Sequence, residues 1–245
     1  MNIFNFQNHT MMWCILIILI LGITVFAFVN QRSFGRNPQG ERLDRIKHSP
    51  HYYDGEFHNK HETPVMTSDE NRFKGFMKFL FGKRSKKLRP DTPLTVIKTD
   101  LKNIDVDKNM IIWFGHSSYL MQISGKRILV DPVFHIASPV SFINKPFKGT
   151  NIYQPEDMPE IDYLVITHDL DYKTVMELKG RIDKVICPLG VGEHFEYWGF
   201  KKECIIELDW EEHANLEKDF TFYCLPTRHF SGRGLTPNPT LWASF

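Results

Sequence analysis

The chain has 245 residues, a length that suits one or two domains. Its 42% hydrophobic and 24% charged residues are ordinary for a globular protein, and a formal net charge of +1 gives no reason to expect a nucleic-acid partner. The cysteines form no CxxC pair, so neither a thiolate metal site nor a disulfide framework is expected; they are Cys14, Cys187, Cys204 and Cys224.

The first predicted element is a membrane-spanning helix over Met11–Val29. This run carries no charge, and its 19 residues span roughly the 30 Å hydrocarbon core at about 1.5 Å per residue. A cleaved signal peptide is the alternative, but no Lys or Arg precedes the run and no A-x-A-like site follows it. We therefore predict an anchor over residues 1–30. The positive-inside rule places the remainder on the cytoplasmic side, with the periplasmic side as the alternative, because these basic residues follow: Arg32, Arg36, Arg42, Arg45 and Lys47.

Residues 31–93 are polar, with scattered Pro and Gly, and are predicted to form a tether. Within them, residues 72–89 combine basic side chains with apolar residues at helical spacing, namely Phe73, Phe76, Met77 and Leu80. One interpretation is a basic amphipathic helix that lies on anionic lipid; the other is a solvated helix that packs its Phe residues on the domain. The residues predicted to face the membrane are Arg72, Lys74, Lys78, Lys83, Arg84, Lys86 and Lys87.

From about residue 94 the pattern changes to short apolar runs separated by turn signals. Ser124 and Gly125 predict a hairpin turn, and the run at 162–167 is apolar enough for a strand that is buried on both faces. Strands followed by strand–helix alternation predict an α/β layered domain over residues 94–245. The predicted strands are 110–114, 118–123, 127–130, 162–167, 184–187, 204–208 and 220–225, and the predicted helices are 172–179 and 191–197.

Histidines stand at the ends of several predicted strands. His168 follows the buried strand and precedes Asp169 and Asp171, while His229 and His116 each follow another strand. A rigid strand end beside a cleft is a natural place for metal ligands, and Asp131 could orient a ligand from behind. A histidine beside carboxylates is also commonly a hydrogen-bonded surface group. The sequence nevertheless favours a hydrolytic metal centre.

Several motifs resemble the metallo-β-lactamase superfamily. The similar branch contains the N-acyl-phosphatidylethanolamine-hydrolysing phospholipase D and relatives of L-ascorbate-6-phosphate lactonase. The resemblance runs from about residue 31 to 245. It rests on RSFGRNPQGERLDRIKHSPHY (32–52), WFGHSSYL (113–120), ILVDPVF (128–134), DYLVITHD (162–169), KVICPLGVGEHFEYWGF (184–200), IIELDWEE (205–212) and LPTRHFSGRG (225–234).

The resemblance implies an αββα sandwich with two zinc ions that activate a hydroxide for attack on a phosphodiester or ester. His168 matches the first histidine of the family's H-x-H-x-D-H signature, and His229 matches a later histidine of the first metal. His116 and Asp131 match positions near the pocket. The implied substrate is a small molecule or a phospholipid-like ester.

The chain departs from the family pattern in two places. The resemblance implies four further residues, HYDH, between Asp169 and Leu170, and a continuation beyond Phe245. We therefore expect an incomplete second half of the sandwich, an uncovered inner sheet face, and at most one weakly bound Zn²⁺, with Asp169 or Asp171 as substitute ligands. The predicted function is an impaired metal-dependent hydrolase; the alternatives are an inactive remnant and a membrane-surface binding module.

Overall fold

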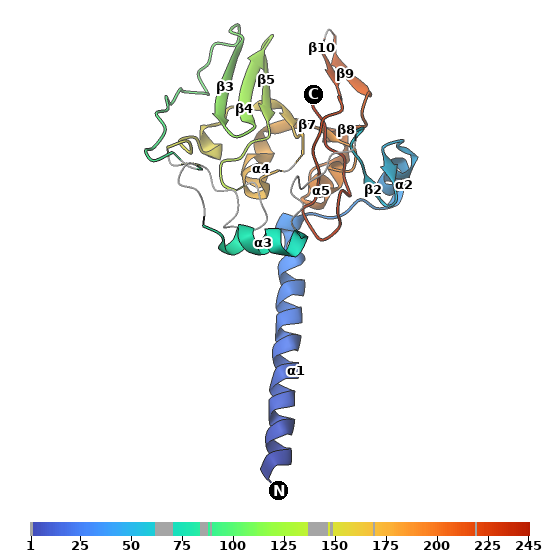
Figure 1. The fold of residues 1–245 in the computed structure, drawn as a ribbon. Coiled ribbons are helices and arrows are strands. Elements are labelled where there is room, and N and C mark those ends of the chain that lie inside the picture. The colour runs from blue at the N-terminus through green and yellow to red at the C-terminus, as the bar shows by residue number, and fades with distance from the viewer. Residues whose placement is uncertain are drawn as a thin grey trace.

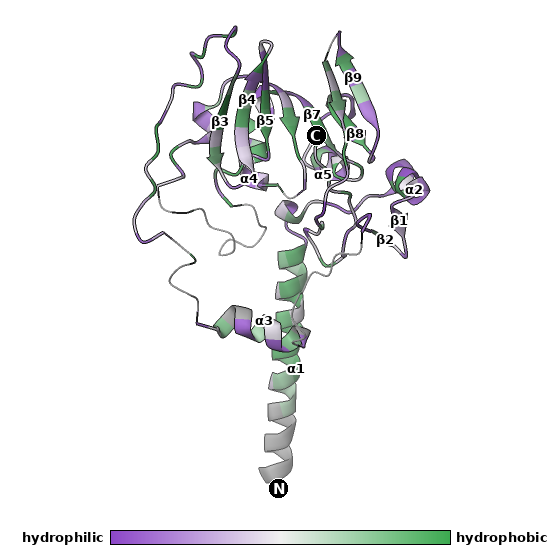
Figure 2. Ribbon diagram, turned by 45° about the horizontal axis from the view of Figure 1, so that its top comes forward, coloured by the Kyte–Doolittle hydropathy of each residue, from purple (hydrophilic) through white to green (hydrophobic). Residues whose placement is uncertain are grey.

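The computed structural model describes residues 2–61, 71–83, 88, 90–136, 147, 149–168, 170–218 and 220–245. A long helix, α1 (Asn2–Val29), projects from a layered domain (Figure 1). Met11–Val29 is the one stretch of the described residues that is long and apolar enough to cross a membrane, and none of it is buried. Figure 2 shows this part of α1 as continuously hydrophobic. The predicted apolar helix is confirmed, and both an anchor and a signal sequence fit it.

The domain is built on a mixed sheet whose strands lie in the order β3-β4-β5-β6-β7-β8. β3, β4 and β5 pair antiparallel, and β5 to β8 pair parallel. The hairpin between β4 and β5 is confirmed, because Ser124 (φ 50°) and Gly125 (φ 75°) are both in the positive-φ region that a type I′ turn requires. The strands are β3 (Met110–Gly115), β4 (Ser118–Ile123), β5 (Lys126–Val130), β6 (Ile161–Val165), β7 (Ile182–Pro188) and β8 (Ile205–Leu208).

Two layers cover the sheet (Figure 1). Helices α4 (Tyr172–Leu178) and α5 (Gly192–Tyr197) pack on one face, where they bury Val175 and Phe195 against the strands. A hairpin of β9 (His213–Glu217) and β10 (Phe220–Tyr223) covers the other face around Phe222. β6 is covered on both sides, which explains why its sequence shows little apolar–polar alternation.

The uncovered sheet face that the sequence predicts is restricted to one edge. The β9–β10 hairpin covers β5 to β7, but Ile111 and Trp113 of the edge strand β3 remain exposed. Their cross-strand partners, Met121 and Tyr119, pack on the covered part of the same face. β9 itself was not predicted, because its residues alternate between exposed and half-buried without a run of apolar side chains.

Much of the predicted tether packs on the domain. It contains α2 (Gly40–His48) and a short hairpin of β1 (Tyr52–Tyr53) and β2 (Glu56–Phe57). Ile46 and Phe57 are fully buried in a core cluster with Leu208 and Trp242. The sequence does not reveal this packing because the partners lie far along the chain, while the segment itself is mostly polar.

The basic segment forms α3 (Arg72–Phe81), so the predicted helix over 72–89 is confirmed for its first part and ends before Gly82. Asn71 caps it by accepting a hydrogen bond from the Phe73 backbone N–H at 2.9 Å. Phe73, Met77 and Phe81 are exposed, so these apolar side chains do not pack on the domain. Other parts of the prediction lie outside the described residues: the side chains of Arg72, Phe76 and Leu80, and the residues Arg84, Lys86 and Lys87.

Candidate metal centre

An open pocket lies where several strands end, and the predicted site residues line it. Asp131 follows β5, His168 follows β6, His116 lies in the β3–β4 turn, and His229 follows β10. The carboxyl ends of parallel strands meet at one edge of a sheet, which brings Asp131 and His168 together. Trp113 and Tyr119 contribute the apolar part of the lining.

A hydrogen-bonded chain orients His168. The buried Asp131 carboxylate accepts from the Thr167 backbone N–H at 2.8 Å and from the Thr167 hydroxyl at 2.6 Å. Since that hydroxyl has a single proton, its oxygen accepts from Nδ1–H of His168, 2.6 Å away. The lone pair of His168 therefore lies on Nε2. A carboxylate behind a ligand histidine is a common arrangement in metal sites, although here Thr167 stands between them.

His229 is held in the same tautomer by different partners. Its Nδ1 lies 2.8 Å from the Phe230 carbonyl oxygen, which can only accept, so Nδ1 carries the proton and Nε2 carries the lone pair. Asn59 fixes the backbone on both sides: it accepts from the His229 N–H at 3.1 Å and donates to the His229 carbonyl at 2.9 Å. Trp242 also donates to the Asn59 Oδ1 at 3.0 Å. Asn59 lies in the predicted tether, and nothing in its local sequence indicates this role.

The two imidazoles are neighbours, with ring centroids 4.4 Å apart. Burial, with a smaller contribution from the neighbouring imidazoles of His229 and His116, lowers the pKa of His168 to about 4. His168 is therefore neutral at pH 7, the protonation state in which an imidazole can bind a metal. His116 lies in the same pocket, and its Nδ1 is 3.0 Å from the Ser117 hydroxyl oxygen.

Asp171 has a different role from the one considered in the sequence. Its carboxylate caps α4 by accepting from the backbone N–H groups of Lys173 and Thr174. Its second oxygen accepts from the backbone N–H groups of His135 and Ile136, at 2.8 and 3.0 Å. Because Asp171 is buried and both of its oxygens are engaged, these contacts account for the residue without a metal ion. Asp169 lies outside the described residues.

The donors that the structure places together do not complete a zinc site. A catalytic zinc ion takes about three protein ligands and keeps one position open. His168 and His229 supply two imidazole nitrogens. Across the described residues, no group of three His, Cys, Asp or Glu side chains is arranged to hold a metal ion. The described part of the pocket therefore fits part of a metal centre and is short of at least one donor.

The architecture and the strand-end histidines can be compared with known proteins. Residues 126–245 match the beta-lactamase superfamily domain. This superfamily domain begins at β5 and includes Asp131, His168 and His229, whereas His116 precedes it. The mixed sheet with helices on one face is consistent with that match.

Curated relatives extend the similarity toward the N-terminus. An uncharacterized protein of Mycobacterium tuberculosis is 36% identical over 203 residues, which cover 80% of this chain and 54% of that protein. The N-acyl-phosphatidylethanolamine-hydrolyzing phospholipase D 1 of Caenorhabditis elegans is 32% identical over 152 residues, covering 54% of this chain and 41% of that protein. The chain thus spans about half the length of the curated relatives it matches. Among solved structures, CmlA, a diiron beta-hydroxylase from Streptomyces venezuelae, is 25% identical with a TM-score of 0.38, over 49% of this chain and 24% of that one.

Proposed function

We propose that the chain is a membrane-anchored hydrolase of the metallo-β-lactamase type, directed at phosphodiester or ester bonds of phospholipid-like molecules. The observation that carries the proposal is the pair of adjacent imidazoles, His168 and His229, with both Nδ1 atoms engaged and both Nε2 lone pairs available. The similarity to a phospholipase D that hydrolyses N-acyl-phosphatidylethanolamine supports the substrate class.

The incomplete donor set limits the proposed activity. Two imidazoles hold a zinc ion less firmly than the three ligands of an ordinary catalytic site. We therefore propose one weakly bound Zn²⁺ per chain and low turnover, with water or another oxygen donor completing the coordination. The alternative is an inactive domain that retains the fold and the pocket but does not hydrolyse the substrate.

The proposed anchor is the apolar helix Met11–Val29, which none of the domain covers. The basic residues that follow it favour the cytoplasmic side for the domain. A protease added outside intact cells, and again after lysis, tests this orientation. Cleavage of the domain in intact cells would place it on the opposite side.

Zinc titration of the full chain in detergent micelles tests the metal site, together with hydrolysis of bis(4-nitrophenyl) phosphate. We expect at most one zinc ion per chain, and its loss in His168→Ala and His229→Ala. His213→Ala is the matched control, because this histidine is exposed on β9, outside the pocket. Unchanged zinc binding in both pocket variants would refute the site. Zinc binding without turnover would support the inactive alternative.

A second candidate function is a membrane-surface module centred on α3. It is favoured by the exposed Phe73 and Phe81, on a helix that also carries Lys74 and Lys78. α3 lies on the side of the domain from which α1 projects (Figure 1). Amine labelling read by mass spectrometry tests this candidate. Lys74 should be protected in vesicles that contain phosphatidylglycerol, and equal labelling in pure phosphatidylcholine would argue against the module.

A further inference from the structure

The apolar helix is packed against the domain at its end rather than connected by a free linker. The chain leaves α1 at Val29 and enters a short 3-10 turn, Arg32–Phe34. The Phe34 ring meets the Phe28 ring of the last helical turn edge-on, with centroids 5.3 Å apart. The Trp198 indole N–H donates to the Arg32 carbonyl at 2.8 Å, which attaches the turn to the end of α5. The last turn of α1 is therefore in contact with a segment that is itself bound to the domain.

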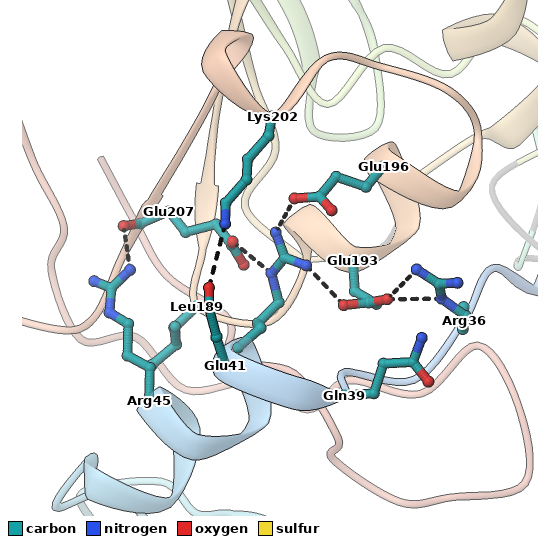
Figure 3. A pocket seen from close by; sticks show the side chains of 10 residues that line it. Arg36, Gln39, Glu41, Arg45, Leu189, Glu193, Glu196, Lys202 and Glu207 are labelled. Carbon is teal, nitrogen blue, oxygen red and sulfur yellow. Dashed lines mark hydrogen bonds and ion pairs between the residues drawn. The ribbon is translucent and has the colours of Figure 1, made fainter.

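Buried ion pairs hold the next part of this segment (Figure 3). The Arg42 guanidinium, which lies in α2, contacts three carboxylates of α5 and β8 at 2.6 to 2.7 Å. Figure 3 shows these carboxylates, Glu193, Glu196 and Glu207, directed toward the guanidinium between them, with Arg36 bound to Glu193 from the other side. Only 3% of the Glu193 side chain is exposed. Bonds of this kind fix the segment in one position, because a buried carboxylate cannot exchange its partner for water without a large cost.

A glycine marks the closest contact between the segment and the domain. Gly35 has φ 72°, and a Cβ there would lie 2.2 Å from Nδ1 of His194. That Nδ1 accepts the Arg36 backbone N–H at 3.1 Å, so the imidazole is an integral part of the contact. A side chain at position 35 would push the segment away from α5.

A small loop is closed at its base by two hydrogen bonds. The Ser231 N–H donates to Oδ1 of Asn238, and the Asn238 N–H donates to the Ser231 carbonyl, both at 3.0 Å. Leu235 lies in the middle of the loop that these two hydrogen bonds close, and its side chain is 84% exposed. The Leu235 side chain therefore adds little to the core, and its apolar surface faces outward from the loop.

The same loop is fastened to the segment that follows α1 on both sides of Leu235. Before it, the buried Arg233 guanidinium donates to the Ser33 carbonyl at 2.6 Å. After it, the Asn37 amide donates to the Thr236 hydroxyl at 3.0 Å. Leu235 is therefore held in a fixed position relative to the segment that follows the apolar helix.

The chain path limits how far the attachment point of this loop, Ser33, can lie from the end of α1. From Val29 to Ser33 the chain can span at most about 14 Å, at roughly 3.5 Å per residue. The 3-10 turn and the Phe28–Phe34 contact make the actual path shorter. The headgroup layer is about 5–8 Å thick on each side of the hydrocarbon core.

We propose that the loop of residues 231–238 is a second membrane contact, with Leu235 inserted into the headgroup layer of the bilayer that α1 spans. The proposal rests on the proposed membrane anchor. The Arg233 guanidinium also donates to the Leu170 carbonyl at 2.5 Å, two residues after His168. The contact thus holds the candidate metal pocket beside the lipid surface in one orientation, so that the headgroup of a membrane-resident amphiphile reaches it.

The test uses the full chain in phosphatidylcholine–phosphatidylglycerol vesicles that contain lipid spin-labelled just below the headgroup. Leu235→Cys is labelled with an environment-sensitive fluorophore, in a background of Cys14→Ser and Cys204→Ser; Cys187 and Cys224 are buried. The matched control is Lys218→Cys, exposed between β9 and β10 at the end of the domain remote from α1 (Figure 1). We expect the label at position 235 to be blue-shifted and quenched, and the label at 218 to be unaffected.

The outcomes separate this contact from the anchor on which it depends. Release of the chain by carbonate washing would overturn the anchor and the contact together. A retained chain with an unquenched label at 235 would overturn the contact alone.

Gly35→Ala tests whether the attachment of the segment positions the loop. Gly55→Ala is its control, because Gly55 also has positive φ, 85°, but nothing lies within 4 Å of an added Cβ. Quenching at 235 should fall in Gly35→Ala and persist in Gly55→Ala. Continued resistance of Cys187 to alkylation reports that the domain is still folded. Undiminished quenching in folded Gly35→Ala would contradict the positioning role.

Discussion

Two polar regions border the same sheet, and their chemistry differs. In the metal pocket, His168 is neutral, and the hydrogen bonds that His168 and His229 make to described residues use Nδ1, which leaves Nε2 for a ligand. In the ion cluster of Arg42, Glu193, Glu196 and Glu207, each charge faces an opposite charge at hydrogen-bond distance (Figure 3). An imidazole lone pair that no protein group uses can bind a ligand. Ion pairs between buried side chains instead fix the position of the segments that carry them.

Burial acts on histidines in both regions. It lowers the pKa of His168 to about 4 and that of His194, beside the ion cluster, to about 3. His194 differs from His168 in its hydrogen bonding. Its Nδ1 accepts the Arg36 N–H, so the lone pair of the neutral ring is occupied by the protein backbone. A low pKa alone therefore does not distinguish a ligand from a structural histidine, and the hydrogen-bond partners do.

The largest expected effect comes from removing the centre of the ion cluster. Arg42→Met leaves Glu207 buried without its cation and Glu193 with Arg36 alone, and should lower the free energy of unfolding by about 3–5 kcal/mol. Urea denaturation in detergent measures it. Lys202→Met is the control, because this side chain is 71% exposed and its contact with Glu41 is 3.5 Å long; its effect should be below about 1 kcal/mol. Equal effects of the two variants would show that the cluster is not structurally important.

The pH dependence of stability is the next largest effect. The folded-state pKa of His168 lies below its unfolded value of 6.5, so the unfolded chain binds more protons between pH 6.5 and about 4. The stabilisation is complete above pH 6.5 and is lost as the pH falls toward 4, by up to about 3 kcal/mol. His194 acts in the same direction. The free energy of unfolding, measured by denaturation at several pH values, should fall less steeply with decreasing pH in His168→Gln than in the unaltered chain. An unchanged pH dependence would show that His168 does not titrate in this way.

The smallest effect tests the orientation of His168 in the pocket. Thr167→Val removes the hydroxyl between Asp131 and His168, and should weaken zinc binding roughly 10–100-fold, as for other groups that orient metal ligands. The free energy of unfolding should fall by about 1–3 kcal/mol, because the buried Asp131 loses a donor. Thr221→Val is the control, since its hydroxyl bonds to Asn215 on the surface. Unaltered zinc affinity in Thr167→Val would separate this chain of hydrogen bonds from metal binding.

The sequence predicted the strand ends that carry His168 and Asp131, because an uninterrupted apolar run directly precedes each of these residues. It also associated His229 with them, and the structure places the two rings in contact. It did not identify Asn59, which fixes His229 from 170 residues away. It also offered Asp171, with Asp169, as a possible substitute ligand, whereas the Asp171 carboxylate caps α4.

Local composition by itself determined the apolar helix, the β4–β5 turn and the strands of the sheet, because each depends on neighbouring residues and their backbone preferences. Only the tertiary structure decided that residues 32–61 pack on the domain, that Arg42 meets Glu193, and that Arg233 binds the Ser33 carbonyl. These arrangements join residues more than 150 positions apart, and a pairing at that separation leaves no periodic pattern in either segment.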